Sequence, residues 1–191
     1  MDPVTLRTDR LVLSVPLPAD TEDVIAYAND PDVVAFIAMP EPYGHAEAHQ
    51  WLTAVVQEGW ATDTQYEFGI RRTGDPRLLG TVGLFGIDGG GAEIGYATHP
   101  DARGQGLVTE AADRVLQWAF APAPQGLGLV RVQWRAKAEN AGSIAVARRL
   151  GMRYEGRRRS AVLHHGVRHD ELLAAVLVDD DRSAGTDWPA S

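Results

Sequence analysis

The order of apolar and polar residues predicts strands and amphipathic helices along the first third of the chain. Residues 11–15, Leu-Val-Leu-Ser-Val, are mostly apolar and β-branched, which is typical of a strand. A helix is expected over 18–28 and should end at 29–31, Asn-Asp-Pro, because turn-forming residues and proline stop a helix. After a short apolar piece at 33–37, apolar residues recur with the spacing of one helix face, which predicts a helix over about 44–60.

The middle of the chain predicts an antiparallel meander. Strands are expected at 66–70, 79–87 and 93–98. The turns between them are short and contain glycine, proline and aspartate, so neighbouring strands should run in opposite directions. The later elements are expected, in chain order, as a helix through 108–119, a strand at 129–134, a helix at 140–150, and strands at 152–159 and 170–178.

Together these elements predict a mixed α/β fold of the α+β type in a single domain over 1–178. The whole chain of 191 residues falls within the usual size of one domain, about 100–200 residues. Residues 179–191 are acidic and polar, and we expect them to form a flexible tail.

Composition narrows the possible functions. A net charge of −8 argues against a nucleic-acid partner, because binding phosphates needs a basic face. No apolar stretch approaches the length of a membrane span and the first residues lack a signal-peptide pattern, so we expect a cytoplasmic protein with no membrane partner. The absence of cysteine excludes disulfides, thiolate metal ligands and a cysteine nucleophile.

The segment 99–110 carries the strongest sign of ligand binding. Gly104 and Gly106 follow a predicted strand and come directly before a predicted helix, so backbone amides at the helix start can face an anion. Arg103 adds a positive charge at the same place. A P-loop is excluded because it needs a lysine that the segment lacks, and a dinucleotide fingerprint fails at Thr109, where it needs glycine. A glycine-rich turn without a ligand remains the alternative at this point.

A second segment argues against a glycine-rich turn without a ligand. Asn140-Ala-Gly-Ser143 precedes a short helix that ends at Leu150-Gly151. Taken separately, Asn140 is explained as a helix N-cap and Gly151 as the glycine that follows a helix. Taken with the loop at 103–108, however, the two segments resemble the GNAT superfamily of acetyl-coenzyme A-dependent N-acetyltransferases. Further segments resemble the branch of ribosomal-protein N-terminal acetyltransferases, namely Leu6–Leu13, Asn29–Pro31, Glu93–Tyr96 and Gly166–Asp170.

The resemblance implies a GNAT-type sheet of about seven strands, mostly antiparallel and splayed, with helices on both faces. It implies acetyl-CoA as the co-substrate, no metal, and an amine acceptor, in a monomer or homodimer. A protein N-terminus is the leading acceptor. A small amine, such as an amino acid or an amino-sugar antibiotic, and an acyl-CoA-binding sensor without catalysis are the alternatives.

The resemblance also assigns site residues. Backbone amides of the loop would hold the coenzyme phosphates, and the strand at 93–98 would pair with its pantetheine arm. Asn140 would hydrogen-bond that arm, Glu93 would act as general base through water, and Ser143 would stand near the sulfur as the substitute acid. The predicted coenzyme-binding residues are Ile94, Tyr96, Ala97, Thr98, Arg103, Gly104, Gln105, Gly106, Leu107, Val108, Asn140 and Ser143.

Two departures from the family pattern bear on catalysis. Val108 stands where glycine or alanine is usual, and the tyrosine acid of many members falls at Ala147, so that acid is missing. Both departures motivate the sensor alternative.

Other conspicuous residues have ordinary explanations beside functional ones. His45 and His49 flank Glu47 in a spacing that differs from the metalloprotease pattern, which favours a solvated helix face. The remaining candidates are surface or packing residues that could instead contact a substrate: His164, His165 and His169 near a predicted hairpin tip, Arg157 to Arg159, and Tyr43, Trp51 and Trp60.

Overall fold

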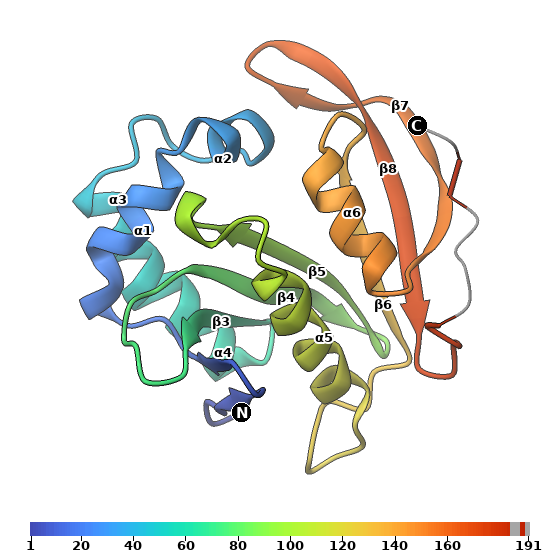
Figure 1. Ribbon diagram of the computed structural model, residues 1–191, viewed down its shortest axis with the longest axis horizontal. Coiled ribbons are helices and arrows are strands. Elements are labelled where there is room, and N and C mark those ends of the chain that lie inside the picture. Colours follow the sequence, from blue (N-terminus) through green and yellow to red (C-terminus); the bar gives the residue numbers. More distant parts are fainter. Residues whose placement is uncertain (184–187, 190–191) are drawn as a thin grey trace. The chain divides into compact units, whose positions relative to one another are not determined.

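A computed structural model describes residues 1–183 and 188–189 of the chain (Figure 1). The chain divides into two compact units. Unit 1 comprises residues 1–87 and 94–115, and unit 2 comprises residues 88–93 and those from 116 onward. That 1–178 act as one domain stays a prediction. Of the predicted tail 179–191, residues 184–187 and 190–191 lie outside the described residues.

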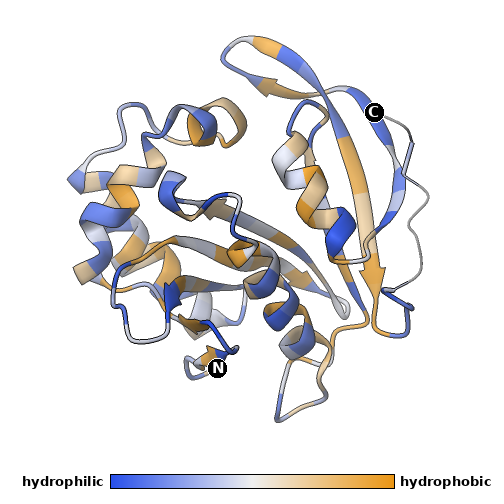
Figure 2. Cartoon of the chain, viewed as in Figure 1, coloured by the Kyte–Doolittle hydropathy of each residue, from blue (hydrophilic) through white to orange (hydrophobic). Residues whose placement is uncertain are grey.

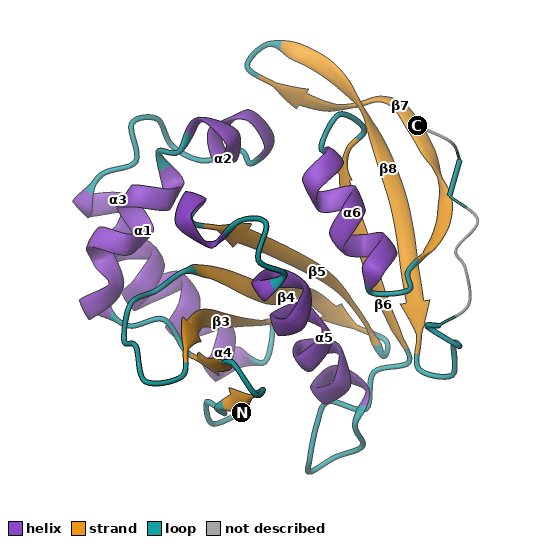
Figure 3. Cartoon of the chain, in the orientation of Figure 1, coloured by secondary structure: helices purple, strands orange, loops and turns teal. Residues whose placement is uncertain are grey.

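The secondary structure follows the predicted order (Figure 3). The helices are α1 (Thr21–Ala28), α2 (Pro31–Phe36), α3 (His45–Gln50), α4 (Val56–Thr62), α5 (Leu107–Phe120) and α6 (Ala141–Arg149). The strands are β1 (Leu6–Arg7), β2 (Leu11–Ser14), β3 (Gln65–Arg72), β4 (Gly80–Asp88), β5 (Gly91–Thr98), β6 (Arg131–Lys137), β7 (Arg153–His164) and β8 (Val167–Leu177). A π-helical segment, Trp51–Val55, joins α3 to α4, so the predicted helix over 44–60 is present as one run.

The strands form an eight-stranded sheet in the order β1-β2-β3-β4-β5-β6-β8-β7. The pairs β1–β2, β2–β3, β3–β4, β6–β8 and β7–β8 are antiparallel, whereas β5 and β6 are parallel. The predicted mixed α/β fold with a mostly antiparallel sheet is therefore confirmed. The extra strand is β1, a short pairing of Leu6 with Leu13 and of Arg7 with Val12.

Strand β3 shows how the apolar pattern builds the core of unit 1. Tyr66, Phe68 and Ile70 alternate along the strand and are buried. The ring of Trp60 in α4 meets Tyr66 and Phe68 edge-on, with centroid distances of 4.8 and 5.2 Å. Such contacts fix α4 against the strand through burial and ring geometry together.

Unit 2 is built on the long pairing of β8 with β6 and β7. Figure 2 shows a run of apolar residues along β8, which includes the buried Ala174, Ala175 and Val176. The β7–β8 hairpin turns at His165 and Gly166, which both have positive φ, and this agrees with the hairpin tip predicted there.

The boundaries of two elements differ from prediction. A new helix, α2, begins at Asn29-Asp30-Pro31, where only a break was expected. The Asp30 carboxylate accepts from the backbone amides of Asp32 and Val33, and Pro31 occupies the first helical position, so the residues that end α1 also start α2. Strand β7 continues past the predicted end at 159, through an irregular register between Arg158 and Val162.

Candidate functional site

The loop between β5 and α5 has the backbone geometry of an anion site. Gly104 and Gly106 have φ of +71° and +73°, a region that L side chains rarely adopt. No atom lies within 4 Å of the position that a Cβ on Gly104 would take. Within the described part of the chain, no hydrogen bond from the backbone amides of residues 104–108 is recorded, and these amides include the first turn of the 14-residue α5. Unpaired amides at a helix start favour a negatively charged ligand.

Arg103, the predicted phosphate contact, is already paired within unit 1. Its guanidinium forms ion pairs with Asp30 and Asp32, the latter at 2.8 Å, and also donates to the Thr98 carbonyl oxygen at 3.3 Å. Burial opposes the ionisation of Asp30, but the hydrogen bond and charge of Arg103 outweigh it and hold the pKa of Asp30 below its usual value. Arg103 therefore ties the loop to the start of α2.

Two arginines that the sequence analysis did not single out converge on Gln105. Arg10 donates to the Gln105 carbonyl oxygen at 3.3 Å, and Arg72 donates to the Gln105 side-chain oxygen. Arg10 is paired with Glu110 in the first turn of α5, and its charge helps to hold the pKa of Glu110 low against burial. Among the described residues, no carboxylate is recorded beside Arg72. Arg72 thus brings an uncompensated positive charge to the loop.

Strand β5 supplies the predicted residues before the loop. Ile94 is buried, and Tyr96, Ala97 and Thr98 are half-buried. Ala97 packs against the apolar cluster that includes Tyr27 and Leu52. Their predicted pairing with a pantetheine arm depends on the backbone and stays a prediction.

Glu93, the predicted general base, lies in the part of β5 that belongs to unit 2. Its carboxylate contacts the Arg135 guanidinium at 2.8–2.9 Å and accepts from the Gln133 amide at 3.4 Å. The hydrogen bond with Glu93 raises the pKa of Arg135 although burial opposes this. The Glu93 carboxylate is therefore engaged by a neighbour that the sequence did not reveal.

Asn140 and Ser143 meet at the start of α6. The Asn140 side-chain oxygen accepts from the Ser143 backbone amide at 3.0 Å, which caps the helix. The Ser143 hydroxyl oxygen accepts from the indole N–H of Trp134 in β6, also at 3.0 Å. Ala147, where the family tyrosine would fall, is fully buried. The fold therefore positions Ser143, the one hydroxyl side chain of α6, through Trp134 and the helix cap.

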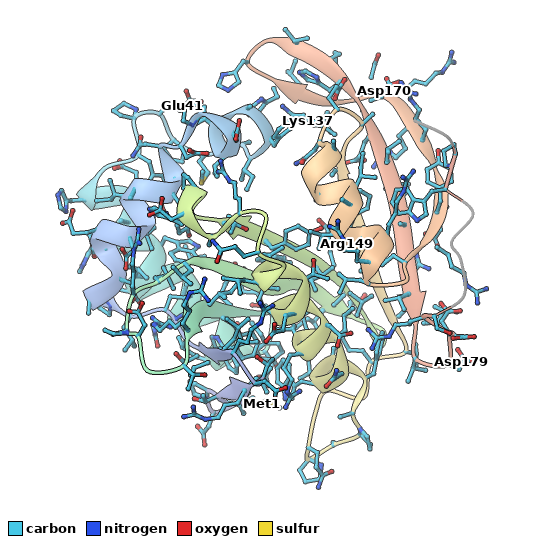
Figure 4. All side chains as sticks on the ribbon, viewed as in Figure 1. Met1, Glu41, Lys137, Arg149, Asp170 and Asp179 are labelled. Atoms are coloured by element: carbon cyan, nitrogen blue, oxygen red, sulfur yellow. The ribbon has the colours of Figure 1, made fainter. Side chains whose placement is uncertain are left out.

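Among the histidines near the hairpin tip, His164 contacts Lys137, the single lysine, which Figure 4 labels. Lys137 and His164 are both buried, and their Nζ and Nδ1 atoms lie 2.6 Å apart. Burial lowers the pKa of Lys137. The His164 ring stacks edge-on with His165 at 4.0 Å between centroids.

Two absences hold for the part of the chain that the structure describes. There, no group of three or more histidine, aspartate or glutamate side chains could hold a metal ion. No helix in the described ranges is long and apolar enough to cross a membrane.

The predicted site residues lie in both units. Unit 1 brings the loop Arg103–Val108 together with Ile94–Thr98, and unit 2 holds Glu93, Asn140 and Ser143. Sequence reasoning missed Arg10, Arg72, Arg135 and Trp134. Three of them lie in strands and Arg10 directly precedes β2, and such positions do not specify a partner.

Comparison with known proteins gives consistent matches. A family model described as an acetyltransferase (GNAT) domain matches residues 10–153. The protein named "Probable N-acetyltransferase YjcK" of Bacillus subtilis (strain 168) is 37% identical over 144 residues, which cover 74% of this chain and 77% of that protein. "Putative ribosomal N-acetyltransferase YdaF" of the same organism is 32% identical over 105 residues, 54% of this chain and 55% of that protein.

Solved structures share the fold. The structure of RimL, described as a ribosomal L7/L12 alpha-N-protein acetyltransferase in complex with coenzyme A, has a TM-score of 0.81 at 17% identity. The alignment covers 93% of this chain and all of that one.

Proposed function

The chain belongs to the GNAT acetyltransferase family, and from that premise we propose that it acetylates the α-amine of a peptide or protein N-terminus. The match to residues 10–153 and the similarity to YjcK confirm the resemblance predicted from the sequence. The protein is an acyltransferase that uses acetyl-CoA as its co-substrate. The choice of acceptor is our proposal.

The loop before α5 fits the phosphates of the coenzyme. Its amides at 104–108 are exposed or half-buried for the most part, and the two left-handed glycines leave the backbone open to a ligand. This open run of amides is the observation that carries coenzyme binding at this loop. We assign the nearby positive charge to Arg72 rather than to Arg103, which two aspartates already neutralise, or to Arg10, which is paired with Glu110.

A thioester is an activated acyl donor, so the chemistry required of the chain is modest. The amine nitrogen bonds to the carbonyl carbon, the carbon–sulfur bond breaks, one proton leaves the nitrogen and one proton ends on the sulfur. Glu93 would take the first proton through water, and Ser143 would supply the second. A backbone N–H of residues 94–98 would stabilise the negative charge on the carbonyl oxygen, a contribution of about 3 kcal/mol in comparable sites. No acyl-enzyme is needed.

The proton-transfer groups of the chain suit an α-amine better than a lysine. Glu93 is engaged by Arg135, and Ala147 replaces the usual acid. An α-amine has a pKa of about 8 and a lysine amine one of about 10.4, so at pH 7.5 the α-amine is neutral about 200 times more often. A site with weak proton-transfer groups therefore works best on the α-amine. The names of YdaF and of the RimL protein support the same acceptor class.

A panel of acceptors tests this proposal. We would measure thiol release from acetyl-CoA with peptides that begin with serine or alanine, with the same peptides N-terminally blocked and carrying an internal lysine, and with amino acids and amino sugars. We expect turnover with the free N-termini and little with the blocked peptides. Faster turnover of a small amine would contradict the proposed acceptor, and coenzyme binding without thiol release from any acceptor would favour an acyl-CoA sensor.

A further inference from the structure

Trp188, near the end of the chain, is held by several contacts within unit 2. Its indole N–H donates to the Met152 carbonyl oxygen at 2.9 Å. Its ring lies at centroid distances of 5.6 Å from both Trp134 and Tyr154, and the guanidinium carbon of Arg148 lies 5.2 Å from the ring centroid. A hydrogen bond, two ring contacts and a cation–π contact therefore define the position of one side chain.

Trp134 connects this cluster to Ser143. Trp134 is only 1% exposed, and a buried indole N–H needs an acceptor, which here is the Ser143 hydroxyl oxygen at 3.0 Å. The ring of the same side chain meets Trp188 at an interplanar angle of 63°. Any movement of the Trp134 ring thus displaces the donor that contacts Ser143.

The backbone at the end of α6 also allows the segment that carries Trp188 to approach. Gly151 has a φ of +75°, and a Cβ there would lie 2.6 Å from the Arg182 carbonyl oxygen. Glycine at 151 therefore permits the chain beyond β8 to pass close to the end of α6. Arg148 of α6 additionally donates to the Pro189 carbonyl oxygen at 3.1 Å.

We infer that Trp188 is a positioning residue for acetyl transfer, which acts by packing against Trp134 and so holding the hydroxyl of Ser143 in place. This inference rests on the proposed role of Ser143 as the group that gives a proton to the leaving sulfur. Trp188 lies outside residues 10–153, the range of the family match, so it is a feature of this chain beyond the family domain.

Trp188 limits the orientations that the Trp134 side chain can adopt. Without Trp188, the outer face of the Trp134 ring loses its aromatic contact, and the indole gains freedom to rotate away from Ser143. An edge-on aromatic contact has an energy that corresponds to a rate effect of about three- to tenfold when it is lost from the transition state. The recorded contacts of Trp188 are with Met152, Trp134, Tyr154 and Arg148, none of which is a predicted coenzyme-binding residue, so the KM for acetyl-CoA should stay unchanged.

The test combines variants of Trp188 with Ser143→Ala. Thiol release from acetyl-CoA is measured with a peptide that begins with serine, and kcat and both KM values are determined for Trp188→Ala, Trp188→Phe, Ser143→Ala and the double variant Trp188→Ala/Ser143→Ala. Ser183→Ala is the matched control, because within the described part of the chain its hydroxyl is recorded only with Asp181 of the same segment. Near-UV circular dichroism reports the coupling of the Trp134 and Trp188 rings independently of activity.

We expect Trp188→Ala to lower kcat about three- to tenfold at an unchanged KM for acetyl-CoA, and to alter the near-UV spectrum. Trp188→Phe keeps the ring contact and should recover most of kcat, which also covers the case in which the alanine variant folds poorly. Adding Trp188→Ala to Ser143→Ala should cause no further loss, because both changes act on the same step.

Two results would overturn the inference while leaving the proposed function intact. One is a normal kcat in Trp188→Ala when Ser143→Ala is slow. The other is an equal loss from Trp188→Ala with and without Ser143. A normal kcat in Ser143→Ala would instead remove the proposed role of Ser143, and the inference with it.

Discussion

Replacement of Glu67 by glutamine should remove a pH-dependent loss of stability. Glu67 lies in β3 and is only 5% exposed, and its Oε2 has no hydrogen-bond partner among the described residues. A Cβ on Gly83 of the paired strand would lie 2.8 Å from that oxygen, so the carboxyl occupies the space that a side chain at 83 would need. Burial raises the pKa of Glu67 from 4.5 to about 8.

The direction of the effect follows from which state binds the proton more tightly. The folded protein favours the protonated carboxyl, so the stability it contributes is fully present below about pH 4.5 and is lost as the pH rises towards 8. The difference of about 3.5 pH units, at about 1.36 kcal/mol per unit, corresponds to about 5 kcal/mol of unfolding free energy in total. Between pH 5 and pH 8 the wild type should lose about 3.5 kcal/mol through this one group.

Guanidinium unfolding followed by tryptophan fluorescence at pH 5, 6, 7 and 8 measures this loss. Glu67→Gln cannot ionise, so its unfolding free energy should rise relative to wild type by about 1.2 kcal/mol on average for each pH unit between 5 and 8. Glu58→Gln, at an exposed position of α4, is the control and should follow the wild-type curve. The test is the slope of the difference in unfolding free energy against pH. The absolute difference at one pH also contains the effect of the amide on local packing.

Parallel curves for the wild type and Glu67→Gln would refute the reasoning. They would mean that the Glu67 carboxyl ionises as easily in the folded protein as in the unfolded chain. Such ionisation requires water or a cation at an oxygen for which no partner is recorded in the described structure.

Changes at three further residues test the site. Arg103→Ala should raise the KM for acetyl-CoA several-fold with kcat within about twofold, because it loosens the loop and removes the arginine that pairs with the half-buried carboxylate of Asp30; an unaltered coenzyme affinity in a binding titration would contradict this. Asn140→Ala should cost about 1 kcal/mol of unfolding free energy through the lost cap. Asn140→Asp should restore stability in the same denaturation assay, and full recovery of the coenzyme KM as well would show that Asn140 acts only as a cap. Glu93→Gln should lower kcat at least tenfold with little change in the coenzyme KM, and an unchanged kcat in steady-state thiol release would remove Glu93 as the base.

Much of the fold was accessible from local patterns. The alternation in β3 and the helical spacing in α3 and α4 reflect which residues must be buried, and this requirement is written into neighbouring positions. The start of α2 was missed because Asp30 serves as a cap, and a proline is as compatible with the start of a helix as with its end. Strand β1 was missed because two residues are too few for a periodic signal.

The candidate site was only partly predictable, because a motif specifies backbone geometry better than side-chain partners. Glycines at 104 and 106 permit the left-handed backbone that the loop adopts, so an open loop before the helix could be expected from residue type. The pairing of Arg103 with Asp30 spans 73 positions, and that of Arg135 with Glu93 spans 42. No local pattern connects residues so far apart.

By itself, the sequence determined the family, the order of elements and the place of the glycine loop before α5, because periodicity and glycine conformation are local properties. Only the tertiary structure decided that Arg103 is already paired with carboxylates, that the Glu67 carboxyl is buried with no recorded partner for its Oε2 among the described residues, and that Trp134 contacts Ser143. Those properties depend on strand order and register, which bring Trp134 beside both Ser143 and Trp188 and place Glu67 opposite Gly83. Burial and partner geometry then set pKa values and side-chain positions, and neither exists until the chain has folded.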